Sequence, residues 1–160
     1  MHNHETDLKR IVSTAIQAEA WAESLYSRLH DAVEDAELKA LLAGLASDEA
    51  RHARILRERY GDPVTPSEGT GAYHQEGVDA SLGQNPKLAD LLEMAIHSEQ
   101  RAHDSYASAS SEAEDPHEKA LFAELAAEEQ RHHELLSNEL KARKGQPWVE
   151  YELDNWVRDD

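Results

Sequence analysis

The 160-residue chain contains no cysteine. This absence excludes disulfide bonds, iron–sulfur clusters, thiol catalysis and cysteine-ligated zinc sites from its chemistry. Glycine and proline are also scarce, with seven and five residues, and most of them fall between residues 61 and 85. Both residue types disfavour the interior of a helix, so the rest of the chain can be largely helical.

Long apolar runs are missing as well, and none approaches the length of a membrane-spanning helix. The first residues lack the basic and apolar regions of a signal peptide. We therefore expect a cytoplasmic protein with no membrane partner. The formal net charge is −17. Because so acidic a surface repels phosphate groups and attracts cations, we also expect no nucleic-acid partner.

Apolar residues recur at spacings of three and four in four stretches, which is the pattern of amphipathic helices. The predicted helices span about 6–30, 35–60, 86–112 and 115–144. Asn85 followed by Pro86, and Asp115 followed by Pro116, resemble helix starts with a capping side chain and proline at the first position. Few residues separate the first two helices, so they are expected to form an antiparallel hairpin.

The segment 61–85 is too long to be a tight turn inside a compact domain. A crossover of this length would place the third helix parallel to the second, as some four-helix bundles require. The sequence thus predicts an all-α fold, with residues 1–144 forming a four-helix bundle. Residues 145–160 form an acidic tail rich in aromatic residues, which we expect to dock on the bundle or on a neighbouring subunit.

The two halves of the chain carry the same possible metal ligands, displaced by 80 residues at every position. Each half has one Glu that is followed by a Tyr seven residues later, and further along a Glu-x-x-His motif. These residues are Glu19, Tyr26, Glu49 and His52 in the first half, and Glu99, Tyr106, Glu129 and His132 in the second. One Glu-x-x-His is weak information in a chain so rich in both residues, but two copies with matching partners are much harder to obtain by chance.

Residues three apart lie on one face of a helix, so the Glu and His of each motif can reach a common metal ion. The two halves together offer four carboxylates and two imidazoles. Four carboxylates in a bundle core would be too costly without cations, and two divalent ions would balance their charge. Oxygen and nitrogen ligands suit iron or manganese better than an ion that prefers thiolates. We expect two iron ions, with manganese or zinc as possible substitutes. The alternative is a duplicated hairpin whose Glu and His lie on solvated faces.

Four further residues neighbour these ligands. Tyr26 and Tyr106 lie two turns beyond Glu19 and Glu99, where each hydroxyl can bond a ligand carboxylate, act in redox chemistry, or simply fill the core. Asp48 and Glu128 precede the motif glutamates and can accept the second N–H of a metal-bound histidine. An ordinary solvated acidic residue is the competing interpretation for these last two.

At these positions the sequence resembles the ferritin-like superfamily and, within it, the rubrerythrin-like proteins. The resemblance implies a ferritin-like four-helix bundle with a non-haem di-iron centre. It further implies that Glu49 and Glu129 bridge the two irons, that Glu19 and His52 complete one iron site, and that Glu99 and His132 complete the other. Tyr26 and Tyr106 join these six residues as predicted catalytic residues.

Two departures from that family are visible. The rubredoxin-like Cys₄ site that rubrerythrins typically add is missing, so an external donor must supply electrons. Rubrerythrins carry a further Glu where this chain has Ala102, which counts against peroxide reduction specifically. The leading hypothesis is a di-iron oxidoreductase that reduces O₂ or peroxide, as a homodimer or larger homo-oligomer. Iron oxidation and storage is the first alternative, and a non-catalytic helical interaction module is the second.

Overall fold

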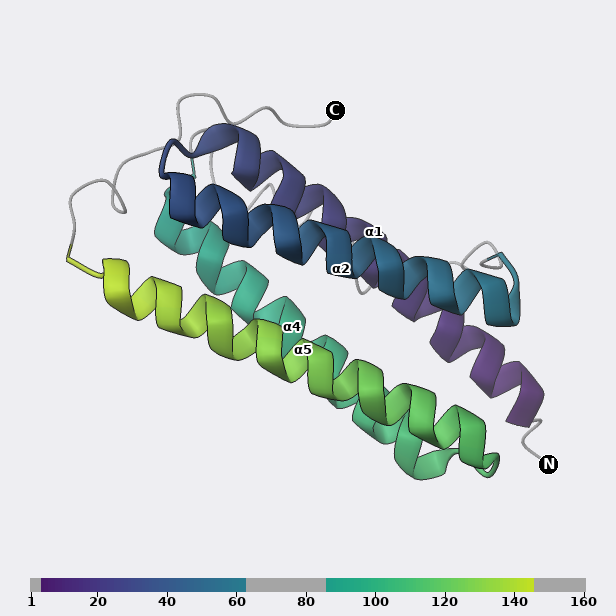
Figure 1. The fold of residues 1–160 in the computed structure, drawn as a ribbon. Coiled ribbons are helices and arrows are strands. Elements are labelled where there is room, and N and C mark those ends of the chain that lie inside the picture. The colour runs from purple at the N-terminus through teal and green to yellow at the C-terminus, as the bar shows by residue number, and fades with distance from the viewer. Residues whose placement is uncertain (1–3, 63–85, 146–160) are drawn as a thin grey trace.

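A computed structural model of the chain describes residues 4–62 and 86–145. Four helices account for nearly all of this part: α1 (His4–Ala32), α2 (Ala36–Tyr60), α4 (Leu88–Glu112) and α5 (Pro116–Arg143). They lie side by side as a bundle (Figure 1). The prediction of an all-α four-helix bundle is confirmed.

The helix starts follow local sequence chemistry, with one exception. Asp35 caps α2 by accepting the N–H of Leu38 at 2.8 Å, and Asp115 caps α5 by accepting the N–H of His117 at 2.7 Å. The prediction that the third helix begins at Pro86 was wrong, because Lys87 has an extended backbone and the helix begins at Leu88. Lys87 makes no side-chain capping bond. The predicted cap, Asn85, lies outside the described residues.

The helices form two hairpins, α1 with α2 and α4 with α5, which face each other (Figure 1). Helices α2 and α4 run in the same direction, as the long connection between them requires. Residues 63–85 of that connection and residues 146–160 of the tail lie outside the described part. The expected docking of the tail therefore stays a prediction.

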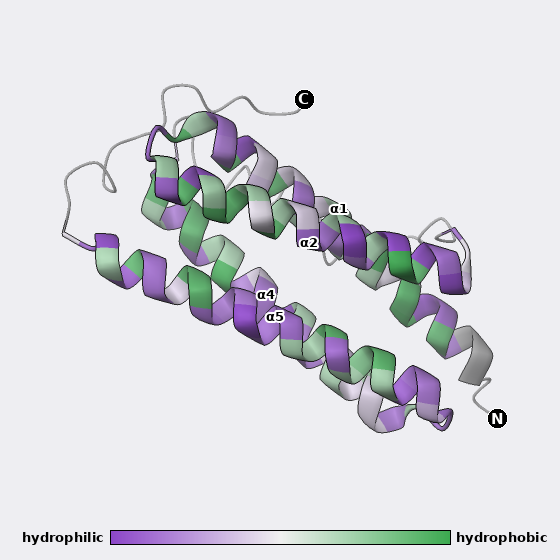
Figure 2. Cartoon of the chain, viewed as in Figure 1, coloured by the Kyte–Doolittle hydropathy of each residue, from purple (hydrophilic) through white to green (hydrophobic). Residues whose placement is uncertain are grey.

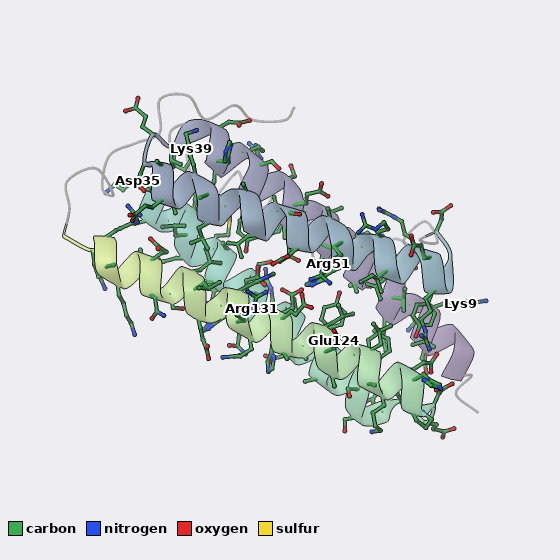
Figure 3. All side chains as sticks on the ribbon, in the orientation of Figure 1. Lys9, Asp35, Lys39, Arg51, Glu124 and Arg131 are labelled. Carbon is green, nitrogen blue, oxygen red and sulfur yellow. The ribbon has the colours of Figure 1, made fainter. Side chains whose placement is uncertain are left out.

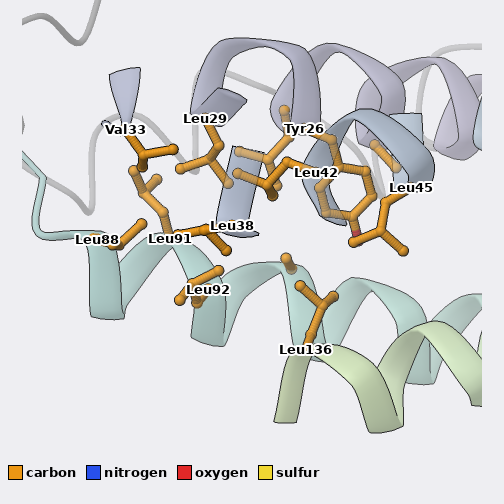
Figure 4. Close-up of a cluster of buried hydrophobic side chains, with 13 residues drawn as sticks. Tyr26, Leu29, Val33, Leu38, Leu42, Leu45, Leu88, Leu91, Leu92 and Leu136 are labelled. Carbon is orange, nitrogen blue, oxygen red and sulfur yellow. The ribbon is translucent and has the colours of Figure 1, made fainter. Parts of the chain in front are cut away.

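The apolar core is divided into two clusters along the bundle. The first contains thirteen buried residues, among them Leu29, Leu42, Leu91 and Leu136, and joins all four helices (Figure 4). The second cluster lies towards the other end and includes Ile16 from α1, Leu56 from α2, Tyr106 from α4 and Phe122 from α5. Hydrophobic and hydrophilic residues alternate along every helix, as burial of one face demands (Figure 2).

Between these clusters each helix places polar residues in its buried face. On α1 the second cluster contains residues 12 and 16, the first begins at Ala22, and Glu19 lies between them. On the other three helices too, polar residues lie between the two clusters: Glu49 with His52 on α2, Glu99 on α4, and Glu129 with His132 on α5. The bundle is therefore a structure with apolar ends and an ionisable layer across its middle.

Candidate metal centre

All six predicted ligand side chains are buried. The residues are Glu19, Glu49, His52, Glu99, Glu129 and His132, and none of them is more than 3% exposed. Each helix contributes at least one of them, so the layer is formed only when the two hairpins pack together. The alternative of solvated Glu and His faces is excluded by this burial.

The six side chains form two overlapping groups, each with the geometry of a metal site. One group contains Glu19, Glu49, His52 and Glu129, and the other contains Glu49, Glu99, Glu129 and His132. Within each group, one potential ligand atom per residue lies within 4.8 Å of every other. Glu49 and Glu129 belong to both groups, which is the position that a bridging carboxylate would occupy.

Both imidazoles turn the same nitrogen towards the carboxylates. Nδ1 of His52 lies 2.9 Å from a carboxylate oxygen of Glu129, and 3.5 Å from one of Glu19 and one of Glu49. Nδ1 of His132 lies 2.9 Å from Glu49 and 3.4 Å from Glu129. The two rings are stacked with centroids 5.9 Å apart. Nδ1 is therefore the nitrogen that can bind an ion in each group.

Burial and mutual contact shift the pKa values of the carboxyl groups in opposite directions. Burial raises the pKa of Glu19 and of Glu99, but hydrogen bonds with Glu49 and Glu129 and with the histidines outweigh it and lower both, that of Glu99 to about 2. Burial raises the pKa of Glu49 and of Glu129 well above the ordinary value, and the neighbouring Glu19 and Glu99 add to the rise. In each contacting pair, the pKa of one carboxyl group is therefore lowered and that of the other is raised.

The pKa values of the two histidines are shifted as well. Burial lowers the pKa of His52 and His132, but the surrounding carboxylates more than reverse it, raising that of His132 to about 12. The carboxylates around the two histidines thus favour their charged form in the metal-free protein. Two divalent cations would offset all four carboxylates and leave both histidines neutral, so the donor set suits two such ions.

Buried oxygen atoms without hydrogen-bond partners give a second test of whether the site suits metal ions. Oε2 of Glu99 and Oε2 of Glu129 are buried and make no hydrogen bond within the described part of the chain. Native proteins rarely leave such atoms unsatisfied, because the desolvation cost is about 1–3 kcal/mol for each. Both glutamates belong to the second group, where a bound cation could satisfy these atoms.

The two tyrosines contact the glutamates of the opposite half of the chain. The Tyr106 hydroxyl donates to Glu19 at 2.6 Å, and the Tyr26 hydroxyl donates to Glu99. Both rings are buried. Burial and the nearby carboxylates raise the pKa of each phenol well above its usual value, so both stay protonated donors. Each tyrosine can therefore hold a ligand carboxylate in place.

Asp48 and Glu128 accept from the outward nitrogens of the histidines. Nε2 of His52 lies 2.6 Å from Glu128, and Nε2 of His132 lies 2.9 Å from Asp48. These contacts match the expected partners of a metal-bound imidazole, and they fix which nitrogen faces the site.

Two arginines that the sequence analysis did not single out extend these contacts. Arg51 donates to Glu128, and Arg131 donates to Asp48 at 3.5 Å. They lie on the facing sides of α2 and α5 (Figure 3). The internal repeat could have pointed to these arginines, because each immediately precedes a motif histidine and the two arginines are 80 residues apart.

Two further ionisable side chains lie one turn from a predicted ligand, Glu23 after Glu19 and His103 after Glu99, and neither joins the site. Glu23 and His103 belong to neither group. Nδ1 of His103 instead lies 2.9 Å from the carbonyl oxygen of Ala126, which ties α4 to α5. A face-sharing position one turn from a ligand is therefore not sufficient to reach the site.

The bundle and this buried layer define the class of the protein as a ferritin-like helical bundle with a carboxylate–histidine cluster that can hold metal. Residues 10–78 and 90–157 match the family described as Rubrerythrin, and the chain belongs to that family. The two matched segments begin 80 residues apart, the same displacement as the repeated ligands. A search of curated proteins gave no match.

Solved structures share the fold. A hypothetical protein from Pyrococcus furiosus is 25% identical with a TM-score of 0.69, over 84% of this chain and 88% of its own. A structure from Bacillus anthracis described as ferritin-like, diiron-carboxylate proteins is 23% identical with a TM-score of 0.66, over 87% of this chain and 99% of its own. Among the described residues, no helix is long and apolar enough to cross a membrane.

Proposed function

We propose that the protein is a non-haem di-iron oxidoreductase that reduces O₂ or peroxide with electrons from an external donor. The observation that carries this proposal is the sharing of Glu49 and Glu129 between two buried ligand groups, each completed by one further Glu and one His. Membership of the Rubrerythrin family and the likeness to a protein named as diiron-carboxylate support iron as the metal. Manganese and zinc are the substitutes that the same ligands accept.

The residues would divide the work as follows. Glu49 and Glu129 would hold both ions, Glu19 and His52 would complete one position, and Glu99 and His132 the other. Two bound ferrous ions would supply two electrons to an oxidant held between them. Tyr26 and Tyr106 orient Glu99 and Glu19 through their hydroxyl groups. Asp48 and Glu128 keep Nδ1 of each histidine directed inwards.

The absence of cysteine supports an external electron donor, since the chain has no thiolate with which to hold an iron–sulfur or rubredoxin-like relay. We further propose a cytoplasmic location. We also propose a homodimer or a larger homo-oligomer as the working form.

The test is metal content and turnover of protein purified without oxygen. We expect about two iron ions per chain, and consumption of O₂ or peroxide when a reductant is supplied. Glu129→Gln should abolish turnover, whereas Glu124→Gln, at an exposed position on the same helix, should leave it unchanged. Protein that takes up no iron would refute the proposal.

The main competing function is iron oxidation with storage, which the ferritin-like fold also supports. A storage protein would form a hollow shell and accumulate iron far beyond its own ligands. Measurement of mass in solution, together with the iron-to-chain ratio after repeated additions of Fe(II) in air, separates the two. A ratio that stays near two in a small oligomer favours the oxidoreductase.

A further inference from the structure

A cavity lies between α1 and α4, beside one half of the candidate metal centre. Its volume is about 530 Å³, within the range of pockets that hold small organic molecules. Glu19 and Tyr106 line it, so it reaches the group formed around His52. Much of its wall is apolar and comes from Ile11, Ala15, Ala18, Ala102 and Ala109.

The internal repeat shows which side chains create this space. The cavity is lined by Thr14, Ser105 and Ala109. The residues 80 positions away are Met94, Leu25 and Leu29, all of them larger. Leu25 and Leu29 are buried in the first apolar cluster, in which Figure 4 labels Leu29, and Met94 packs against that cluster. Larger side chains therefore occupy the matching positions on the side of Glu99 and Tyr26.

Burial of matched small residues shows the same difference. Ala15, Ala18 and Ala102 are half-buried on the cavity side. Their counterparts Ala95, Ser98 and Ala22 are exposed by only 0%, 5% and 6%. These counterparts are no bulkier than a serine, so the difference comes from what packs around them. Among the described residues, the Glu19 side of the repeated centre is therefore more open than the Glu99 side.

We propose that this cavity binds a small organic molecule without negative charge, which has an apolar body and a hydroxyl-sized polar group, placed beside the Glu19–His52 position. The apolar wall suits the body, and the hydroxyl groups of Thr14 and Ser105 can bond the polar group. An anion would lie against Glu19 and find only Arg10 as a cation in the lining, at the exposed rim. The placement beside a metal position rests on the proposed function, whereas binding in the cavity does not.

The first test uses 2-naphthol as the probe, titrated into metal-loaded and chelator-treated protein. We expect one molecule per chain in both. The double variant Ser105→Leu/Ala109→Leu, which copies the residues of the Glu99 side, should weaken binding at least about tenfold. Ala107→Leu makes a similar size increase at an exposed position of α4 outside the cavity, and should bind as wild type does. Thermal unfolding of each variant confirms that it is folded.

The second test asks which metal position the probe approaches. Glu99→Gln should retain the Glu19–His52 position, and Glu19→Gln should retain the Glu99–His132 position. With Co(II) bound, 2-naphthol should change the visible spectrum of Glu99→Gln and not that of Glu19→Gln. An equal response in both variants would overturn the assignment of a more open and a less open side.

The outcomes separate the cavity from the metal chemistry. Wild-type protein that binds metal but not 2-naphthol, or a double variant that binds it as tightly as wild type, overturns the inference. Protein that binds 2-naphthol but no metal would leave the cavity site standing and refute the proposed function. If the face is covered by a second copy of the chain, wild type would be a dimer that excludes the probe and the double variant a monomer, which also overturns the inference.

Discussion

The sharing of Glu49 between both ligand groups leads to a prediction about how many ions each variant holds. Glu19 belongs to one group only, whereas Glu49 belongs to both. Glu19→Gln should therefore bind one divalent ion per chain, and Glu49→Gln should bind both ions weakly. Glutamine has nearly the same shape as glutamate, so the comparison removes a ligand charge with little change in packing.

The size of the effect on stability follows from the number of sites. An ion present at about 100 times its dissociation constant stabilises the folded state by about 2.7 kcal/mol per site, or about 5 kcal/mol for two sites. For a chain of this length, 1 kcal/mol moves Tm by about 2–4 °C, so two ions should raise Tm by roughly 10–20 °C. Glu19→Gln should keep about half of this rise, and Glu49→Gln almost none of it.

The assay is thermal unfolding followed by circular dichroism, with excess chelator and with Mn(II), which avoids oxidation during heating. Metal per chain is measured on the same samples. Glu124→Gln, exposed on α5, serves as the control and should show the full wild-type rise. Retention of two ions and the full rise by Glu49→Gln would refute the shared-ligand arrangement. Equal loss of both ions in Glu19→Gln would do the same.

Three further predictions concern single contacts. The backbone N–H of Leu38 and the neighbouring Arg143 lower the pKa of Asp35. The ionised Asp35 therefore contributes to stability above its unfolded-state pKa, and this contribution is lost as pH falls below about 4. The difference in unfolding free energy between wild type and Asp35→Ala should narrow between pH 5 and pH 3. Tyr26→Phe removes the hydroxyl donor to Glu99 and should lower the unfolding free energy of chelator-treated protein by about 1–3 kcal/mol, measured by urea unfolding. It should also weaken the binding of one ion and not of the other. Equal weakening of the binding of both ions would contradict this prediction. Leu42→Ala empties a fully buried position and should cost about 2–5 kcal/mol without changing the metal-to-chain ratio, whereas Leu135→Ala, 37% exposed, should cost less than about 1 kcal/mol.

The grouping of the six candidate ligands was predictable because it depends on local geometry. A spacing of three residues puts Glu49 and His52 on one face of a helix whatever the rest of the fold does. The repeat then showed that the second half of the chain does the same with Glu129 and His132. The structure places all six predicted ligands in one buried layer. Their binding of iron stays a proposal.

The contacts between hairpins were less accessible to sequence reasoning. Tyr26 bonds Glu99 and not the Glu19 of its own helix, because the tyrosine reaches across the bundle. Arg51 reaches Glu128 on the opposite hairpin for the same reason. Such pairs depend on how far apart two helices lie and how they are rotated, and no spacing within one helix encodes either quantity.

The start of α4 shows a local limit. Asn85 and Pro86 look like a cap and a first helical residue, but Lys87 is extended and the helix begins at Leu88. A capping sequence indicates where a helix can begin. The helix in fact begins at Leu88, a residue that is buried in the first cluster.

The sequence alone determined that this chain forms amphipathic helices and that two copies of one ligand pattern lie in their apolar faces, because both features follow from the 3.6-residue period. Only the tertiary structure decided that the copies meet in a common layer and that they are not equivalent. Small side chains leave a cavity beside Glu19, whereas leucines occupy the matching positions on the side of Glu99. Because side chains in a protein interior are closely packed, a difference of a few carbon atoms between the repeats makes one side more open than the other. This difference appears only when α1 and α4 pack together.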